Sequence, residues 1–378
     1  MRKLIGVFVA GLFTVAMLAA GTANAQDKDA PNIKVRFLLQ SQVQMTENGN
    51  PDGDGLGTEF FLRRARIILA GNINKLVHFF VETDNPNMGK NGDWGKAFFI
   101  QDAFVDFQFM PEFNVAAGMI LLPFTHHNRQ SATSLNSVDY HNLFSSRFIK
   151  DFVWRDAGIE VRGIVANMLD YHLGIFNGLR GAKVDGMETL NPNDLPRIAG
   201  RLALNIFEPE TGFFYGGTYL GKKKVLQFGA GFDMQPDSIL SESGTTSMYT
   251  AVSADAFWNI PLDDKMELTG QVAFVWYNRG HELTAGTVGT FTPHAGTGMG
   301  VYGDLGFRYD VYQPTLGGEW FNSDKEGADL ANLRADFLWW FNGHSANLKL
   351  EYAYLIAGEG IDFGDGASQV TLQSQFLF

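Results

Sequence analysis

The feature that most constrains the fold is the pattern of hydrophobicity after residue 25. A helix that spans a bilayer needs about 20 mainly apolar residues, and the later apolar stretches, such as 337–341, are far shorter. Instead, residues 331–339 and 346–354 place apolar side chains at every second position, with polar side chains between them. This period of two is typical of β-strands that have one apolar and one polar face.

The first 25 residues have the pattern of a targeting segment. Arg2 and Lys3 precede a nearly apolar run, and Ala23-Asn24-Ala25 supplies a small-residue cleavage pattern before polar residues begin. The pattern predicts a secretory signal peptide at 1–25 and a mature chain at 26–378. An uncleaved anchor helix is the alternative, but the apolar run is short for spanning a bilayer.

Composition excludes several classes of protein. The chain has no cysteine, which excludes disulfides, thiolate metal sites and covalently attached haem. Its formal net charge of -12 argues against a sequence-independent nucleic-acid binder. No Gly-x-Ser-x-Gly elbow, P-loop or His-Glu-x-x-His motif is present. The sequence therefore predicts neither an enzyme nor a cofactor.

The alternation predicts sixteen long strands. Their ranges are 33–44, 58–71, 75–84, 98–109, 113–121, 152–163, 169–177, 196–207, 223–234, 247–259, 265–278, 299–310, 313–322, 328–341, 346–357 and 367–378. A soluble sandwich would turn the apolar faces inward, whereas a transmembrane barrel turns them to lipid and lines a wet lumen with the polar faces. Long strands, aromatic residues near strand ends and connections that alternate between short and long favour an all-β, antiparallel transmembrane barrel.

Two connections stand out from this rhythm. Connection 208–222 is long where a short turn is expected, so it could hold another hairpin, and a barrel of 18 strands stays open as an alternative. Connection 122–151 is the third long loop and the longest of them.

The last strand ends on Phe378, which shares an apolar face with Val370, Leu372 and Phe376. A terminal Phe on an alternating strand resembles the signal read by the barrel-assembly machinery of Gram-negative bacteria. We therefore expect that machinery as a partner, and a location among the lipids of the outer membrane.

An ordered series of motifs resembles the phosphate-selective porin O and P family. The motifs are Arg63-Arg64-Ala65-Arg66 leading to Gly71, Gly118 through Pro123-Phe124, Arg155-Asp156-Ala157-Gly158, Gly174-Ile175-Phe176-Asn177-Gly178, Gly200-Arg201-Leu202 and Tyr219-Leu220-Gly221-Lys222. The resemblance implies a 16-stranded trimeric porin whose third extracellular loop folds into the lumen. Since the strand map independently makes 122–151 the third long loop, we expect 122–151 to be the constriction loop.

Charge and width at the constriction decide the selectivity of a pore. The strand phases point basic side chains into the lumen, among them Lys34, Arg36, Arg64, Arg66, Arg162 and Arg201, but a similar number of carboxylates point inward too. The constriction loop itself carries the candidates Arg129, Arg147, Lys150, His126 and His127. A slightly basic constriction would favour anions, since guanidinium groups match phosphate and carboxylate oxygens. A dense ladder of arginines is not evident, which departs from the phosphate specificity that the family name implies.

These observations predict a passive outer-membrane channel for small hydrophilic solutes and ions, with phosphate as one candidate. The alternative is a barrel that sheathes a partner, such as an electron conduit; an inserted loop 122–151 argues for the pore and a displaced loop for the sheath. Residues 48–59 match the oxygen spacing of a calcium loop, and His126, His127 and His141 could bind a metal, but a polar surface loop and a buried histidine cluster explain the same residues. No metal site is therefore predicted.

Overall fold

The computed structural model describes residues 31–143, 154–184, 187–240, 245–279, 297–324, 329–357 and 366–378. The predicted signal peptide at 1–25 lies outside these residues. In this part of the chain, no helix is both long and apolar enough to cross a membrane.

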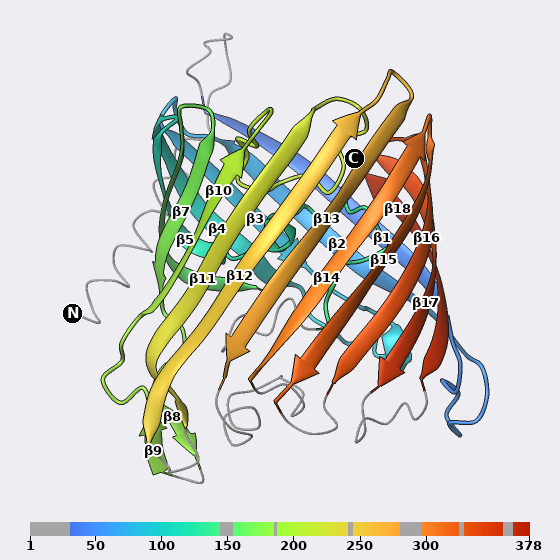
Figure 1. Ribbon diagram of the computed structural model, residues 1–378, viewed down its shortest axis with the longest axis horizontal. Helices are drawn as coiled ribbons and strands as arrows, with labels where there is room; N and C mark the ends of the chain where they lie inside the picture. Colours follow the sequence, from blue (N-terminus) through green and yellow to red (C-terminus); the bar gives the residue numbers. More distant parts are fainter. Residues whose placement is uncertain are drawn as a thin grey trace.

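Sixteen antiparallel strands close into one barrel (Figure 1). They are β1 (Asn32–Thr46), β2 (Gly57–Asn72), β3 (Val77–Asp84), β4 (Phe99–Met110), β5 (Phe113–Leu121), β6 (Arg155–Val165), β7 (Leu169–Phe176), β10 (Arg197–Asn205), β11 (Val225–Leu240), β12 (Thr246–Pro261), β13 (Met266–Asn278), β14 (Gly298–Tyr309), β15 (Tyr312–Ser323), β16 (Leu330–Asn342), β17 (Ala346–Ala357) and β18 (Ala367–Leu377). The sixteen-strand prediction is confirmed, and each predicted strand has its counterpart. The largest difference is at β11, which continues past residue 234 through an irregularity between Gln235 and Ile239.

The alternative of 18 barrel strands is wrong. Two further short strands, β8 (Ala182–Val184) and β9 (Met187–Leu190), pair only with each other as a separate hairpin. The hairpin lies beyond one end of the barrel, at the bottom of Figure 1. Connection 208–222, which was the suspected location of extra strands, contributes none to the barrel.

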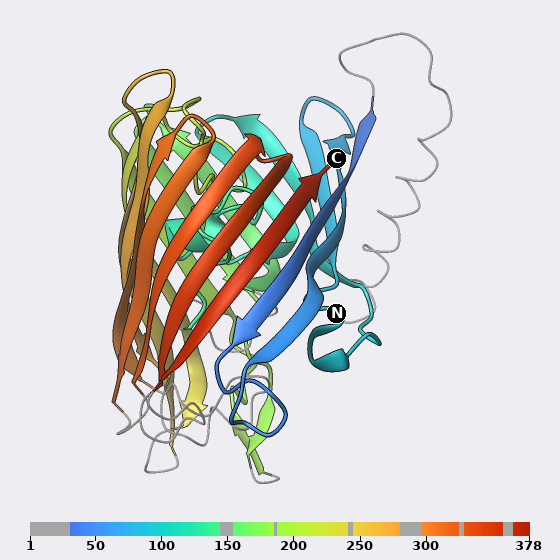
Figure 2. The ribbon, with the colours of Figure 1, turned by 90° about the vertical axis from the view of Figure 1, so that its right-hand side faces the viewer.

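The two ends of the chain close the barrel. β1 and β18 pair from Leu38 opposite Leu377 to Thr46 opposite Gln369, and Figure 2 shows β1 in blue beside β18 in red. Phe37 and Phe378 exchange two backbone hydrogen bonds, and their rings stack with centroids 5.7 Å apart. The terminal aromatic residue therefore completes the closure of the barrel between β1 and β18.

The barrel wall has its apolar side chains outside and its polar side chains inside. On β16, Leu333 and Phe337 are exposed while Arg334 and Asp336 are buried. Tyr312 stacks between Phe337 and Trp339 near one rim, as expected for an aromatic girdle at a membrane interface. This arrangement is the inverse of a soluble sandwich, because the apolar face has no second sheet to cover it.

The two rims of the barrel differ in their connections. One rim, called the turn rim below, carries the short turns such as 310–311 and 343–345, together with connection 206–224. The opposite loop rim carries the long connections, including the one that follows β5. In Figure 1 the turn rim lies at the top and the loop rim at the bottom.

Candidate functional site

The connection after β5 turns into the barrel and crosses its lumen; its described part is called loop 122–143. It begins with the one-turn helix α2 (His126–Arg129), which is capped by the side chain of Thr125 accepting from the backbone N–H of Asn128. The backbone of Phe124 lies directly against β11, where Gly231 has no Cβ that would collide with the Phe124 carbonyl oxygen. On the neighbouring strand β12, the Ser253 hydroxyl donates to the same carbonyl oxygen at 2.9 Å.

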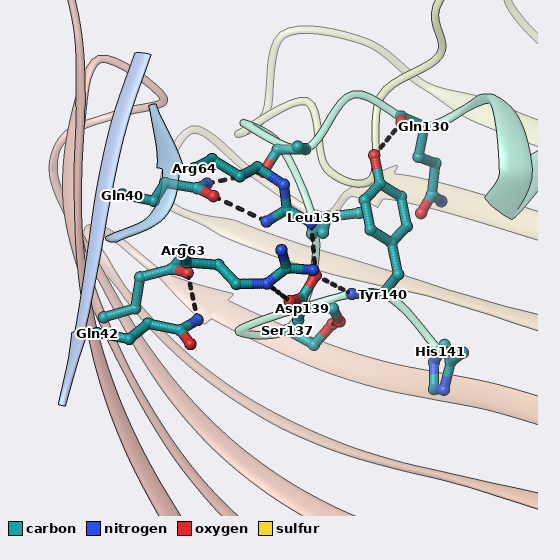
Figure 3. Close-up of polar contacts among 12 residues, drawn as sticks. Gln40, Gln42, Arg63, Arg64, Gln130, Leu135, Ser137, Asp139, Tyr140 and His141 are labelled. Carbon is teal, nitrogen blue, oxygen red and sulfur yellow. Dashed lines mark hydrogen bonds and ion pairs between the residues drawn. The ribbon is translucent and has the colours of Figure 1, made fainter. Parts of the chain in front are cut away.

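Asp139 anchors the loop to β2 by a double ion pair (Figure 3). A register shift between Gln40 and Ser41 of β1 places a bulge in β2, so that Arg63 and Arg64 both reach the lumen. Arg63 and Arg64 each bind one oxygen of Asp139, the latter at 2.7 Å. Burial alone would raise the pKa of Asp139, but the two guanidinium groups hold this pKa well below its usual range.

Strands β1, β16 and β17, which lie on the same side of the barrel as β2, hold the loop through further polar contacts. Lys349 on β17 donates to the carbonyl oxygens of Leu135 at 2.8 Å and Ser137 at 2.9 Å. Asp336 on β16 accepts from the backbone N–H of Val138 at 2.9 Å. The amide of Gln40 on β1 bonds to Ala132 O at 3.2 Å. The loop is therefore fixed to strands around much of the circumference.

Histidines of the loop lie in a buried polar cluster. The His141 ring is 2.9 Å from the Asp304 carboxylate on β14, and its backbone N–H donates to His127 Nε2 at 2.9 Å. Burial, together with the charge of Arg334, lowers the pKa of His141 to about 4. Burial also lowers the pKa of His127 well below its ordinary value. Both rings are therefore neutral at physiological pH. The described residues contain no group of three or more side chains arranged to hold a metal ion.

Connection 206–224, called segment 206–224, enters the lumen from the turn rim and meets loop 122–143. Phe213 stacks on Phe104 of β4 at 4.1 Å, and Phe214 packs against Phe80 of β3 at 5.1 Å. The Tyr215 hydroxyl donates to Asp170 on β7. Burial and the Asp170 charge raise the pKa of Tyr215 well above its ordinary value, so the hydroxyl keeps its proton.

Arg129, the first constriction candidate, lies between the two inserted segments. Its side chain is fully buried, 3.3 Å from Glu160 of β6, and donates to Phe213 O at 2.9 Å. The rings of Phe213 and Tyr215 also cover its guanidinium, at 4.9 and 5.4 Å from their centroids. In this conformation Arg129 joins the inserted segments to the wall and is shielded from solutes.

The other constriction candidates have different positions. His126 stacks on Phe257 at 3.9 Å and pairs with Glu210 of segment 206–224 at 2.7 Å. Arg147 and Lys150 lie outside the described residues. The role of these residues in selectivity stays a prediction.

Four of the six basic wall candidates lie inside the barrel and are paired with carboxylates. Arg64 binds Asp139 at 2.7 Å, Arg66 binds Glu82 and Asp84, both at 2.8 Å, Arg162 binds Asp106 at 2.6 Å and Arg201 binds Asp255 at 2.5 Å. Lys34 and Arg36 are exposed on the first part of β1, before the point where β18 begins to pair with it. These two side chains therefore lie at the turn rim, outside the enclosed lumen.

Three residues that the sequence analysis left out are central to this site. Arg63 was missed because strict alternation would point it outward, and the bulge in β2 overrides that rule. Tyr215 and Glu210 were missed because segment 206–224 was treated as a turn or a hidden hairpin. The unusual length of this connection was the available signal.

Side chains occupy much of the described interior of the barrel. Side chains that face inward from all around the wall have no accessible surface: Gln40, Asp102, Glu160, Arg197, Glu267 and Gln373. A cavity of about 690 Å³ remains at the turn rim, lined by loop 122–143, segment 206–224 and turn 343–345. Its wall includes Thr133, Tyr215, Lys222 and His344. We call this space the vestibule.

One protein-family model matches part of this chain, and solved structures share its fold. The family model described as phosphate-selective porin O and P matches residues 33–188, which confirms the resemblance indicated by the motifs. No curated protein sequence matches the chain significantly.

Solved structures of outer-membrane channels share the barrel. The channel DcaP of Acinetobacter baumannii is 13% identical, with a TM-score of 0.58 over 94% of this chain and 100% of that one. The anion-selective porin of Comamonas acidovorans is 12% identical, with a TM-score of 0.60 over 92% and 100%. The outer membrane protein OmpT of Vibrio cholerae, in its trimer form, is 9% identical, with a TM-score of 0.53 over 93% and 100%.

The family match and the closed barrel together support a passive porin channel in the bacterial outer membrane. They point to a channel rather than to an enzyme.

Proposed function

We propose that this chain forms a diffusion channel for small hydrophilic solutes and ions, narrowed by loop 122–143 and working without covalent chemistry. The observation that carries the proposal is the polar lumen of a lipid-facing barrel, crossed by a loop that is anchored to β2 through Asp139. The turn rim would face the periplasm, because short turns lie on that side in single-chain outer-membrane barrels.

The pairing of lumen charges supports weak charge selectivity. Arg64, Arg66, Arg129, Arg162 and Arg201 each have a carboxylate partner. A guanidinium that already binds a carboxylate offers little net charge to a passing anion. We therefore propose a general channel with at most a slight preference for anions, and no specific phosphate site among the described lumen residues.

The sheath hypothesis receives less support. Loop 122–143 and segment 206–224 occupy lumen space that a partner protein would need. Gln40 on β1 donates to Ala132 O of the loop, Glu160 on β6 lies 3.3 Å from Arg129 of the loop, and neither wall residue has accessible surface.

We also propose that the chain assembles as a homotrimer. The outer face of β1, β2, β17 and β18 has a shallow hollow of about 280 Å³, and its mainly apolar lining includes Val43, Phe60, Trp94, Leu348 and Leu372. An apolar hollow on the outer face gives side chains of a second barrel wall a place to pack. Delivery by the barrel-assembly machinery through Phe378 also stays a proposal. Chemical cross-linking of the detergent-extracted protein would give a three-subunit band, and a single-subunit band alone would contradict the trimer.

Planar-bilayer recording under a KCl gradient tests the channel and its selectivity. The proposal predicts stepwise conductance, a reversal potential close to zero and no block by phosphate at low concentration. A reversal potential that reports strong anion selectivity, together with block by phosphate, would show that the protein is a specific anion channel and not a general one. Folded barrels that never conduct would contradict the channel itself.

A further inference from the structure

Loop 122–143 and segment 206–224 meet along a short backbone contact, called the seam. Gln130 and Tyr215 form an isolated parallel β-bridge. Tyr215 N donates to Arg129 O at 2.8 Å, and Ser131 N donates to Tyr215 O at 2.9 Å. Gly217 N donates to Ser134 Oγ at 3.1 Å. The two inserted segments, which come from opposite rims, thus form one continuous barrier.

The seam lies at the edge of an open space. On the side of the turn rim lies the vestibule, whose lining includes Ser131, Ser134, Tyr215 and Gly216 from both halves of the seam. Arg129, whose backbone belongs to the seam, and its partner Glu160 have no accessible surface. A solute that reaches the vestibule therefore meets the seam as its next obstacle.

The two halves of the barrier are attached to the wall in different ways. Loop 122–143 contributes charged side chains to wall partners, as Asp139 does with Arg63 and Arg64. In segment 206–224, three of the charged side chains bind the segment itself or the loop. Glu210 binds His126, Lys223 donates to Pro209 O and Glu208 accepts from Lys224 N.

The contacts between segment 206–224 and the wall are mostly aromatic or single hydrogen bonds. Phe213 and Phe214 stack on the wall, and Tyr219 N donates to Asn259 on β12 at 2.9 Å. The Thr218 hydroxyl donates to Glu267 on β13 at 2.8 Å. A stacked ring pair or a neutral hydrogen bond can be exchanged for water at about 1 kcal/mol. The bonds from Thr218 to Glu267 and from Tyr215 to Asp170 go to carboxylates and cost about 1.5–3 kcal/mol each, whereas breaking a buried ion pair costs about 3–5 kcal/mol.

We propose that segment 206–224 is the movable half of the constriction, and that solutes pass when it withdraws from loop 122–143 along the seam. The inference rests on the proposed channel function and adds how that channel opens. Loop 122–143 stays in place during opening, and segment 206–224 swings toward the vestibule. The size of the gap left by segment 206–224 then limits the size of the solute.

A cysteine pair across the seam tests this motion in a chain that has no cysteine of its own. Strand neighbours lie about 4.8 Å apart, within the Cα range of about 4.4–6.8 Å that a disulfide tolerates. We expect the Gln130→Cys/Tyr215→Cys variant to conduct in steps when reduced and to lose nearly all steps when oxidised. The Gln130→Cys and Tyr215→Cys single variants provide the control and should not respond to oxidant. Equal conductance of the oxidised and reduced double variant would overturn the proposal.

A shortened variant gives an independent reading. Replacing 209–221 by a four-residue Gly/Ser turn should raise single-channel conductance several-fold and admit larger neutral solutes. The matched control replaces hairpin 182–190, which lies outside the barrel, and should conduct as the unmodified protein does. Unchanged conductance after removal of 209–221, in a barrel shown to be folded by its heat-dependent mobility in gels, would contradict the movable segment. If the shortened barrel and the reduced cysteine variant both fail to conduct at all, the channel function itself is refuted.

Discussion

Two chain segments fill this barrel, and the contrast between them shows how one lumen can be both rigid and permeable. Loop 122–143 enters from the loop rim and is held by ion pairs: Asp139 pairs with the partly exposed Arg63 and the buried Arg64, and Arg129 pairs with Glu160, both fully buried. Segment 206–224 enters from the turn rim and is held by stacked rings and single hydrogen bonds. The first arrangement resists displacement, whereas the second can be broken one small contact at a time.

The largest effect should follow from removing the charge of Asp139. In the Asp139→Asn variant, the buried guanidinium of Arg64 and the partly exposed one of Arg63 lose their counter-charge. The cost approaches the roughly 3–5 kcal/mol of a fully buried pair. We expect a lower free energy of unfolding in urea and new protease cleavage within loop 122–143.

The matched control for this variant is Asp194→Asn. Asp194 also binds an arginine, Arg180, but both side chains are half exposed, and exposed pairs contribute little to stability. Equal stability losses in the two variants would show that the anchor of loop 122–143 is no stronger than a surface pair.

Acidification should weaken a second attachment of the same loop, at His141 beside Asp304. The pKa of His141 is lowered to about 4 by burial and by Arg334, against about 6.5 in an unfolded chain. The native state therefore binds fewer protons than the unfolded state between these values, so stability is full above pH 6.5 and falls as pH drops toward 4. Asp304, Glu319 and His127 also face this ring.

The free energy of unfolding should fall by about 3 kcal/mol between pH 6.5 and pH 4. The pKa of His141 is lowered from about 6.5 to about 4, and each pKa unit corresponds to about 1.4 kcal/mol. Thermal unfolding from pH 7 to pH 4 measures this decrease. The His141→Gln variant should show a flatter profile over this range, and an unchanged profile would rule out His141 as the titrating group.

A smaller effect is expected when the aromatic anchors of segment 206–224 are removed. The Phe213→Ala/Phe214→Ala variant loses two ring pairs, each worth about 1 kcal/mol. Channel openings should become more than tenfold more frequent, while the barrel stays folded. The control is Phe207→Ala, in the same segment but exposed; if both variants open equally often, the anchors are not at Phe213 and Phe214.

The smallest effect concerns one hydrogen bond of the seam. Ser134→Ala removes the acceptor of Gly217 N, worth about 1 kcal/mol, which corresponds to about fivefold more frequent opening. Ser137→Ala removes a hydroxyl that bonds within the loop, to Asp139 O, and should leave opening unchanged. Single-channel recordings of both variants separate the seam from the loop.

The strands were predictable from the sequence because their signal is local. Period-two alternation depends only on neighbouring residues, and it set β17 at 346–357, matching Ala346–Ala357 in the structure. It also predicted that Arg162 and Arg201 point inward, and in the structure these two side chains pair with Asp106 and Asp255. The bulge that turns Arg63 inward was not predictable, because it arises from the pairing of β2 with β1 and leaves no mark in the alternation.

The candidate site was less predictable because it depends on contacts between distant residues. Arg129 was identified as a lumen charge, but its pairing with Glu160 and its cover by Tyr215 join chain segments from different strands and connections. The length of 208–222 was noticed, yet its inward course is set by partners such as Gln130 and Phe104. Residue types alone do not specify such partners.

Hydrogen exchange of the unmodified protein in a lipid bilayer tests the central contrast most directly. The account predicts that the backbone amides of Tyr215 and Gly217 in segment 206–224 exchange much faster than that of Val138, which bonds to Asp336 in loop 122–143. Equal protection of the two segments, or faster exchange in loop 122–143, would contradict the assignment of segment 206–224 as the movable half.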